Sequence, residues 1–473
     1  MKSETLLLWL NAMIYFMLYK TLFNRIFCCK LCMRFAYLSI SDGYLHFWYV
    51  RIPRGKKRGH DIIKKQIVRK KDDRVVRKKV YGNIKRNTQH VTAAFLWFFR
   101  QESAGGILLL FCAVVAMLIA NSALGTSYEY ILHEQVTLGY GTWSLSMSLL
   151  HWINDGLMAL FFFVVGMEIK REFLFGELKS PSSMLLPIAA AVGGMVVPAV
   201  LYSVFNIGRP SLNGWGVPMA TDIAFSLGVL AFAAPKAPRP IVVFLTALAI
   251  VDDLGGILVI ALFYSNELHG PALVAGAVLV AVLGIASRLR LQTAAVYLLG
   301  GLGLWYAFLQ GGIHPTIAGV LLGFAIPAGT AKTHASSLLA RWEHRLTPWS
   351  AFLVMPVFAL GNAGIALDAG SLQAVVSPVG AGVLAGLFVG KPLGIFGTVY
   401  GLLRLRIASM PKGVRLSHFL GAGILGGIGF TMSLFIASLA FVDVQDLMTA
   451  KTAVVIASLL SGLTGTLVFR KIR

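Results

Sequence analysis

The sequence predicts an all-α polytopic membrane protein. Of its 473 residues, 57% are hydrophobic and only 13% are charged, which is too apolar for a soluble globular chain of this length. From Phe98 to the C-terminus, apolar runs alternate with short polar or Gly/Pro-containing breaks. A helix needs about 20 mostly apolar residues to cross a bilayer, and most of these runs come close to that length. The pattern therefore indicates a bundle that spans the membrane many times.

The apolar runs number twelve and give the expected membrane helices in chain order. They occupy residues 105–124, 150–169, 183–205, 217–233, 240–264, 271–287, 292–309, 312–328, 349–367, 380–402, 419–441 and 450–469. Every second connection carries several Lys or Arg residues, and the connections between them are nearly free of both. Because basic connections stay on the cytoplasmic side, both termini are expected there, which agrees with an even number of spans.

Residues 1–97 are predicted to form a basic N-terminal extension. The first 100 residues hold 22 Lys and Arg and 5 Asp and Glu, so they carry 22 minus 5, or +17, of the net charge of +22. Thr5–Tyr19 is apolar but short for a span, and it is expected to be at most an extra membrane-associated helix. The basic run 51–90 suits an arm for nucleic acid or anionic lipid, but a solvated tail, or an extension outside the natural product, is favoured. No nucleic-acid partner is expected.

The longest connection on the outer side, residues 121–148, contains two stretches of alternating polar and apolar residues. These are Glu134–Tyr140 and Ser144–Ser148, which together fit either a small β-hairpin or an ordinary loop. An exposed hairpin edge can pair with a second copy of the same strand. The sequence thus leads us to expect a homodimer formed through this outer hairpin.

Two adjacent acids, Asp252 and Asp253, lie inside the fifth apolar run. An Asp near the centre of a membrane helix costs roughly 2.5–3.5 kcal/mol on insertion scales, so a pair of them indicates a function. Carboxylates in such a place can hold a proton or a hard cation, because hard cations prefer oxygen ligands. A site that holds the two in turn would exchange them.

Three further charged residues lie in the predicted spans. Asp155 is near the start of the second span, where it is either an intramembrane acid or a helix cap. Asp222 lies between Pro and Gly residues in the fourth span, and the eleventh span is interrupted by several glycines, so both are predicted to be broken helices. Asp222 could offset the partly positive N-terminal ends of the half-helices and Lys391 the partly negative C-terminal ends.

Lys391 is predicted near the middle of the tenth span and needs an acidic partner there. Asp252 or Asp253 would serve. The alternative is that the ammonium group extends to the membrane surface from a helix end.

Rival functions share some of these features. An intramembrane aspartyl protease also needs two acids, but on separate helices and with a Gly-x-Gly-Asp type of motif that is absent here. A cation channel would use rings of acids or carbonyls around a continuous pore. A sodium-coupled solute symporter is the nearest alternative to an exchanger.

Six motifs, in order along the chain, resemble the NhaA sodium/proton antiporters of bacterial inner membranes. They are Trp152–Ala159, Val165–Glu172, Ala220–Phe225, Ala249–Gly255, Gly390–Gly394 and Gly427–Ser433. The resemblance runs from about Phe98 to the C-terminus, and it implies a twelve-helix antiporter domain over residues 98–473. It also implies inverted-topology repeats with the fourth and eleventh helices interrupted and crossed, for which the NhaA family is a standard example.

The resemblance implies electrogenic exchange of Na+ or Li+ for more than one proton, regulated by pH and serving sodium and pH homeostasis. Such a protein is a secondary active transporter, not an enzyme, and needs no cofactor besides the transported ions. It would lie in the bacterial inner membrane with the lipid bilayer as its surroundings. The family's cation and proton site falls on Asp252 and Asp253, with Asp253 the more important ligand.

Other family positions also have counterparts in this chain. Thr221 and Asp222 match the helix crossing, and Lys391 matches the lysine paired with the first acid. Residues linked to pH response match Glu168, Arg171, Glu172, Glu343, His344 and His314. Thr347 stands where relatives carry a second histidine, which puts the pH threshold in doubt. The long basic extension is also outside the family's pattern, which leaves Met33 or a later residue as an alternative start.

Overall fold

The structure is a computed structural model, and it describes residues 37–41, 44–48, 103–140, 143–176, 181–265, 268–330, 333–366 and 368–472. The chain falls into two units, Met1–Thr88 and Gln89–Arg473. In the first unit, strands β1 (Tyr37–Ser41) and β2 (Tyr44–Trp48) pair antiparallel. The expected helix at Thr5–Tyr19 and the basic run 51–90 lie outside the described residues.

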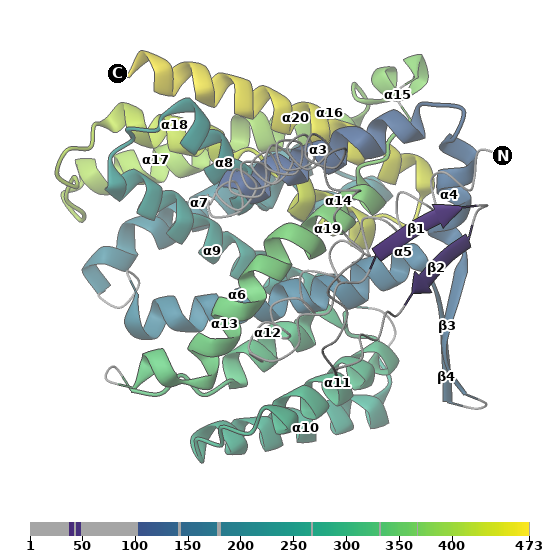
Figure 1. Ribbon diagram of the computed structural model, residues 1–473. Coiled ribbons are helices and arrows are strands. Elements are labelled where there is room, and N and C mark those ends of the chain that lie inside the picture. Colours follow the sequence, from purple (N-terminus) through teal and green to yellow (C-terminus); the bar gives the residue numbers. More distant parts are fainter. Residues whose placement is uncertain are drawn as a thin grey trace, which may run out of the picture. The chain divides into compact units, whose positions relative to one another are not determined.

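The second unit is helical apart from one hairpin (Figure 1). Its elements up to the middle of the chain are α3 (Ser103–Ala120), α4 (Gly125–His133), β3 (Gln135–Tyr140), β4 (Trp143–Ser148), α5 (Leu149–His151), η1 (Trp152–Leu157), α6 (Met158–Phe175), α7 (Pro181–Asn206), η3 (Pro210–Met219), α8 (Ile223–Ala233), α9 (Arg239–Phe263) and α10 (Gly270–Arg288). The rest are α11 (Ala294–Gly311), α12 (Thr316–Ala325), η4 (His334–Ser336), α13 (Leu338–Trp349), η5 (Ser350–Val354), α14 (Met355–Asn362), α15 (Ala369–Ala374), α16 (Pro378–Ala385), η6 (Gly386–Gly390), α17 (Lys391–Arg404), α18 (Leu416–Gly426), α19 (Phe430–Ala440) and α20 (Val444–Lys471).

Every apolar run predicted from the sequence falls on one helix or on two or three consecutive helical segments. Within the described part of the chain, seven helical stretches are long and apolar enough to cross a membrane, and three more pairs qualify when both members are taken together. Two of these pairs, η3 with α8 and α18 with α19, each bend by 44° at a short break. The chain is therefore a multi-pass membrane protein, and both predicted interruptions are present.

The boundaries differ from the prediction in three places. The first half of the fourth segment is a tight 3-10 helix that begins at Pro210, before the predicted start at residue 217. The eighth segment, α12, has only 10 residues, fewer than predicted. The amphipathic helix α13 occupies much of a stretch that is predicted as a connection, although its apolar residues follow a helical spacing in the sequence.

Of the two alternatives for the connection 121–148, the structure has the β-hairpin, and the ordinary loop is wrong. Strands β3 and β4 pair antiparallel, with Gln135 opposite Ser148 and Tyr140 opposite Trp143. The Nε1–H group of Trp152 donates a hydrogen bond of 3.0 Å to the carbonyl of Val136, which ties the hairpin to η1. Figure 1 shows both strands at the edge of the helical unit.

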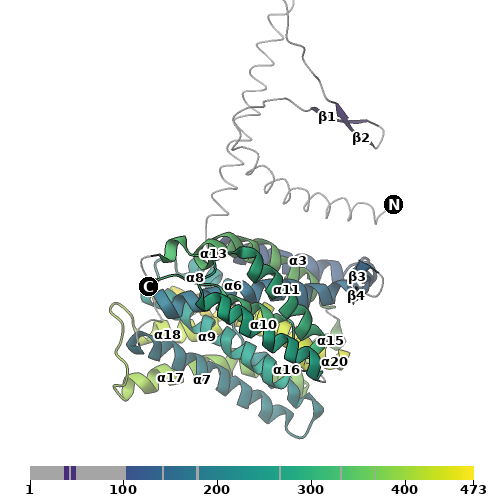
Figure 2. The ribbon, with the colours of Figure 1, turned by 90° about the horizontal axis from the view of Figure 1, so that it is seen from below.

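Close helix pairs depend on glycines that let backbones approach. A Cβ atom at Gly319 of α12 would meet the carbonyl oxygen of Ala159 in α6, and one at Gly394 of α17 would meet the carbonyl oxygen of Gly193 in α7. Small residues at such contacts are the usual way for membrane helices to pack tightly. Figure 2 shows α7 and α17 side by side, and in Figure 1 α10 and α11 lie on the opposite side of the bundle from α17 and α20.

Candidate ion site at the crossing of two interrupted helices

Helix α9 carries Asp252 and Asp253 into the interior of the bundle. The two side chains belong to residues that are 1% and 2% exposed. In the described chain, the Oδ1 atom of each acid is buried and has no hydrogen-bond partner. Two buried carboxylate oxygens without donors are costly unless something else binds them, and a proton or a hard cation would do so.

Asp252 has two partners at its other oxygen. The Lys391 ammonium group lies 2.6 Å from Asp252 Oδ2, and both side chains are fully buried. The hydroxyl of Thr221 donates to the same oxygen at 2.7 Å. Of the two partners that the sequence left open for Lys391, the structure has Asp252, and the alternative of an ammonium group extended to the membrane surface is wrong.

Lys391 also neutralises a helix end. It begins α17, directly after the π-helical segment η6, and its ammonium group donates to the carbonyl of Met219, the last residue of η3. The C-terminal end of a helix is partly negative because its last carbonyls lack intrahelical donors. The lysine thus bridges a carboxylate on α9 and the negative end of a half-helix. The sequence predicted that Lys391 would offset such a C-terminal end.

Asp222 neutralises the partly positive N-terminal ends of two half-helices. Its Oδ1 atom accepts from the backbone N–H of Phe225 at 2.9 Å, which caps α8. Its Oδ2 atom accepts from the backbone N–H of Thr431 at 3.2 Å and from the Thr431 hydroxyl, at the start of α19. One negative charge therefore stabilises the positive ends of both half-helices, which is the role predicted for this residue.

The remaining backbone groups at the crossing are bonded across the two breaks. The backbone N–H of Asp222 donates to the carbonyl of Ile428 at 2.7 Å, and the hydroxyl oxygen of Thr221 lies 2.8 Å from the carbonyl oxygen of Gly426, a second acceptor for its one proton. Unwound backbone is tolerated inside a membrane only when its polar groups find partners within the protein. These bonds explain why the chain can be broken twice at this depth.

Sequence reasoning missed the hydroxyl residues that support the crossing. Ser226 donates to Leu425, Ser433 donates to Val217, and Ser458 of α20 accepts from the N–H of Phe430, at 2.9, 2.8 and 3.1 Å. All three serines are buried. The presence of serines within apolar runs could have indicated such hydrogen bonds. Their partners could not be predicted, because they are distant in the sequence.

Asp253 differs from Asp252 because no lysine is bonded to it. The negative charges of Asp252, Asp222 and Glu168 repel an ionised Asp253 carboxylate, and the positive charge of Lys391 attracts it. No group of three or more His, Cys, Asp or Glu side chains gathers anywhere in the described ranges, so these residues do not form a typical transition-metal site. A monovalent cation bound as cargo by a few carboxylate oxygens fits the pair better.

A second charged cluster joins α6 to α13. Arg171 lies 2.8 Å from Glu343 and 2.7 Å from Glu172. Burial raises the pKa of Glu343, and the Arg171 charge partly opposes that change. Glu168 lies on the same helix as Arg171, one turn earlier, and His344 next to Glu343 is exposed. The residues predicted for pH response are thus brought together, apart from His344 and His314.

Asp155 does not cap a helix, so that alternative is wrong. It lies within the π-helical segment η1, where its residue is 7% exposed, and its carboxylate pairs with His151 at 2.8 Å. His314 lies between α11 and α12, and its Nε2 atom is 2.6 Å from the carbonyl oxygen of Tyr264.

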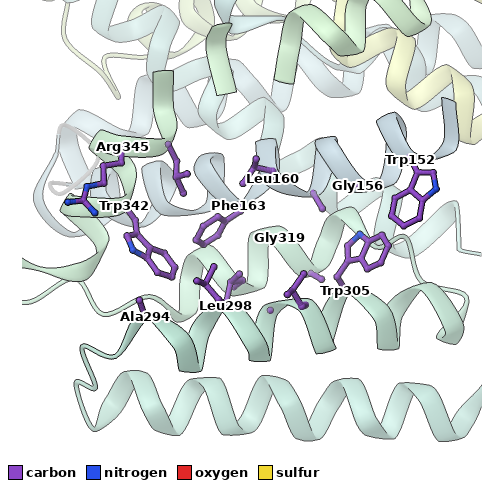
Figure 3. Close-up of a pocket in the computed structure, with 16 residues that line it drawn as sticks. Trp152, Gly156, Leu160, Phe163, Ala294, Leu298, Trp305, Gly319, Trp342 and Arg345 are labelled. Carbon is purple, nitrogen blue, oxygen red and sulfur yellow. The ribbon is translucent and has the colours of Figure 1, made fainter. Parts of the chain in front are cut away.

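A cavity of about 550 Å³ opens between α6, α11, α12 and α13 (Figure 3). Trp152 and Trp305 lie at one end of it, and Trp342 and Arg345 lie at the other. Its lining is mostly apolar, and neither Asp252 nor Asp253 belongs to it. The cavity is therefore separate from the candidate ion site.

The fold and the site define a multi-pass membrane protein with buried charges at the crossing of two interrupted helices, an arrangement typical of secondary transporters. A profile described as Na+/H+ antiporter 1 matches residues 97–469. The chain belongs to this family, and the resemblance to NhaA antiporters is confirmed.

Individual relatives agree with this assignment. A Clostridium beijerinckii protein named Na(+)/H(+) antiporter NhaA 1 is 52% identical over 381 residues, which cover 80% of this chain and 95% of the relative. A Vibrio cholerae protein named Na(+)/H(+) antiporter NhaA is 48% identical over 345 residues, covering 73% of this chain and 88% of the relative. Among solved structures, the sodium proton antiporter MjNhaP1 from Methanocaldococcus jannaschii aligns with 77% of this chain and 92% of its own, with a TM-score of 0.46 and 15% identity.

Proposed function

We propose that residues 98–473 export Na+ or Li+ from the cell in exchange for external protons. The observation that carries this proposal is the pair of buried, unpartnered carboxylate oxygens on Asp252 and Asp253 beside the crossed helices. The names of the relatives, which are sodium/proton antiporters, support the same exchange.

The mechanism is competition at one site under alternating access. When the site faces the cytoplasm and both acids are deprotonated, a cation binds Asp253 and the open oxygen of Asp252. The protein then changes conformation, protons from outside displace the cation, and the protonated carrier returns. More than one proton returns per cation because each of the two carboxylates can take up a proton once the cation has left, so the exchange is electrogenic.

Lys391 and Thr221 position Asp252 in this scheme. Their bonds to Asp252 Oδ2 hold one oxygen and leave the other for the cation. Asp222 keeps the two half-helices together while the site is emptied and refilled. These residues therefore shape the site without needing to move with the ion.

We also propose the finer architecture. Twelve helices arranged as inverted repeats account for the two interrupted helices, and the alternation of basic connections supports an inner-membrane protein with both termini in the cytoplasm. The Arg171, Glu172 and Glu343 cluster lies at the cytoplasmic end of α6 in this orientation and regulates exchange by pH. The β3–β4 hairpin joins two copies into a dimer at the outer surface.

Proton flux in everted membrane vesicles from an antiporter-deficient bacterial strain tests the function. The vesicles are acidified by respiration and then given NaCl, LiCl or KCl at several pH values. We expect Na+ and Li+, but not K+, to collapse the pH gradient, and Asp253→Asn to abolish the response. Glu129→Gln, an exposed acid on α4, is the control that should behave as the unmodified protein.

Two outcomes would contradict the proposal. Coupled transport retained in Asp253→Asn would remove the aspartate pair from the mechanism. No response to Na+ at any pH would favour the symporter alternative, and a screen of organic solutes for an effect on sodium flux would then follow.

A further inference from the structure

His151 and Asp155, here called the outer pair, form a close contact between an imidazole and a carboxylate that the exchange mechanism does not use. The distance from His151 Nε2 to Asp155 Oδ2 is 2.8 Å. The Asp155 side chain is only 9% exposed, whereas that of His151 is 49% exposed. A buried carboxylate is thus connected to solvent through an imidazole, the one side chain whose ordinary titration range covers pH 5 to 8.

The backbone at the outer pair departs from a regular α-helix. Asp155 lies in the π-helical segment η1 between α5 and α6, and π-helical turns within α-helices occur frequently at functional sites. The carbonyl of Asp155 accepts a hydrogen bond of 3.0 Å from the Nε1–H of Trp305 on α11. Trp152 stacks on Trp305 with ring centroids 6.0 Å apart, which holds η1 against α11 (Figure 3).

A third titratable group connects the outer pair to the helices of the ion site. The charges of both Asp155 and His151 act on His314. His314 in turn contacts the carbonyl of Tyr264 at the C-terminal end of α9, the helix of Asp252 and Asp253. The hydroxyl of Tyr264 donates to the carbonyl of Asn213 in η3 at 2.7 Å. Electrostatic interaction therefore links the outer pair to His314, and contacts lead from His314 to α9 and to one interrupted helix.

The outer pair is distant from the cluster of Arg171 and Glu343. Asp155 and Arg171 are separated by 16 residues of one helical stretch, about 24 Å at the rise of an α-helix. The neighbouring helix α4 carries Glu129, His133 and Glu134, and in the described part of the chain none of these forms an ion pair with the outer pair. Among the described residues, His314 is a further titratable group on which the charges of both members of the outer pair act.

We propose that the outer pair is an external proton-binding site, through which protons from the outside solution are received before they reach Asp252 and Asp253. This inference rests on the proposed exchange. A proton bound by His151 stays close to a buried carboxylate, so the outer mouth holds a proton at higher external pH than a carboxylate alone would. The site adds an external pH dependence that is separate from the cytoplasmic cluster.

A sided transport assay tests the proposal. Everted vesicles expose the cytoplasmic face to the bath, so their lumenal pH is the external pH of the cell. Initial rates of radioactive Na+ uptake are measured while the lumenal pH is varied by preloaded buffer at a fixed bath pH. The measurement is then repeated with the bath pH varied and the lumenal pH fixed.

In the unmodified protein, uptake should fall as the lumenal pH rises, because protons become scarce at the outer face. In His151→Gln we expect this fall at a lumenal pH lower by about one unit, because an unassisted carboxylate binds protons at lower pH than an imidazole does. The bath-side profile should not move. His133→Gln, an exposed histidine on α4, should leave both profiles unchanged.

A double-mutant cycle adds a second measurement. If the two residues act as one unit, His151→Gln with Asp155→Asn should shift the lumenal profile no further than the larger single change. Lumenal profiles of His151→Gln and the unmodified protein that superimpose would overturn the inference, as would equal shifts on both sides, which would indicate a purely structural pair. Absence of Na+ uptake in the unmodified protein at every pH would instead contradict the proposed function itself.

Discussion

At the scale of single residues, the site depends on buried charges that are each bonded to a specific partner. Lys391 and Asp252 form an ion pair with no exposure to solvent. The gain from such a pair seldom exceeds the cost of removing both charges from water, whereas removing one partner leaves the other charge uncompensated at a cost of about 3–5 kcal/mol. The pair is therefore better explained by the site than by stability.

This asymmetry gives a prediction for Lys391. Lys391→Met should lower the thermal stability of the purified protein markedly, because Asp252 would remain buried with only the Thr221 hydroxyl as its partner. The double variant Lys391→Met with Asp252→Asn should recover much of the loss, since both charges are then absent. Melting temperatures of the four proteins in detergent measure the coupling. A double variant as unstable as the sum of the two single changes would show that the residues act independently.

At the scale of helices, close backbone contacts hold α6 to α12. A Cβ atom at Gly319 would overlap the carbonyl oxygen of Ala159 and would lie 3.0 Å from the backbone N of Phe163. Neither atom can move without moving α6, which carries Glu168 and Arg171. The packing of this helix pair thus sets the position of the cluster of Arg171 and Glu343.

Gly319→Ala should therefore destabilise the protein and lower its exchange rate. Gly284→Ala on α10 is the matched control, because a Cβ atom there would meet nothing within 4 Å. In the control, Ala should stabilise the helix by about 0.5–1 kcal/mol, since it has less backbone freedom to lose. Opposite changes in melting temperature are expected, and equal changes would mean that helix propensity, not contact, governs both sites.

The ion pair between α6 and α13 predicts a dependence on pH. Burial raises the pKa of Glu343, so its carboxyl is neutral to a higher pH than an ordinary glutamate and ionises as the pH rises further. Its attraction to Arg171 at 2.8 Å is fully present only above that pH and is lost as the pH falls. If this pair regulates exchange, Glu343→Gln should keep the low-pH behaviour at every pH.

The pH profile of Na+-driven proton flux in vesicles measures this effect. His344→Gln provides a comparison next in sequence, and because His344 is exposed we expect a smaller shift. Unchanged profiles in Glu343→Gln would exclude the ion pair as a pH-sensitive element.

At the scale of the whole molecule, the hairpin is the main structure outside the helices of the second unit. Its strands have unpaired edges, and Leu138 on β3 is 56% exposed. Exposed apolar edges favour pairing with another chain, and charged residues on them oppose it. The hairpin is bonded to the helices through Trp152, so a dimer formed there would be continuous with η1.

Leu138→Lys should shift the protein from dimer to monomer, as measured by native mass spectrometry in detergent. Thr137→Lys, on the neighbouring position of the same strand, is a useful second variant because its hydroxyl bonds to Ser146 within the hairpin. Transport should persist in the monomer, because the ion site lies within one chain. An unchanged mass in both variants would contradict the proposed dimer through the hairpin.

The sequence by itself determined the membrane class, the order of the helices, the two interruptions and the acids and lysine of the site. These follow from composition and from single residues whose presence in an apolar run has a large energetic cost. It also left three choices open. Strand pairing decided for the hairpin, a contact across 139 positions decided the partner of Lys391, and the position of Asp155 within η1 decided against a helix cap.

Only the tertiary structure decided which groups satisfy the broken helices. The bonds from Thr431 to Asp222 and from Ser226 to Leu425 span about 200 residues. Hydroxyl residues are common in apolar helices, so their presence in a sequence carries little information about their partners. The partners are determined by how the helices cross, because a buried polar group must be bonded by whatever neighbour the packing brings to it.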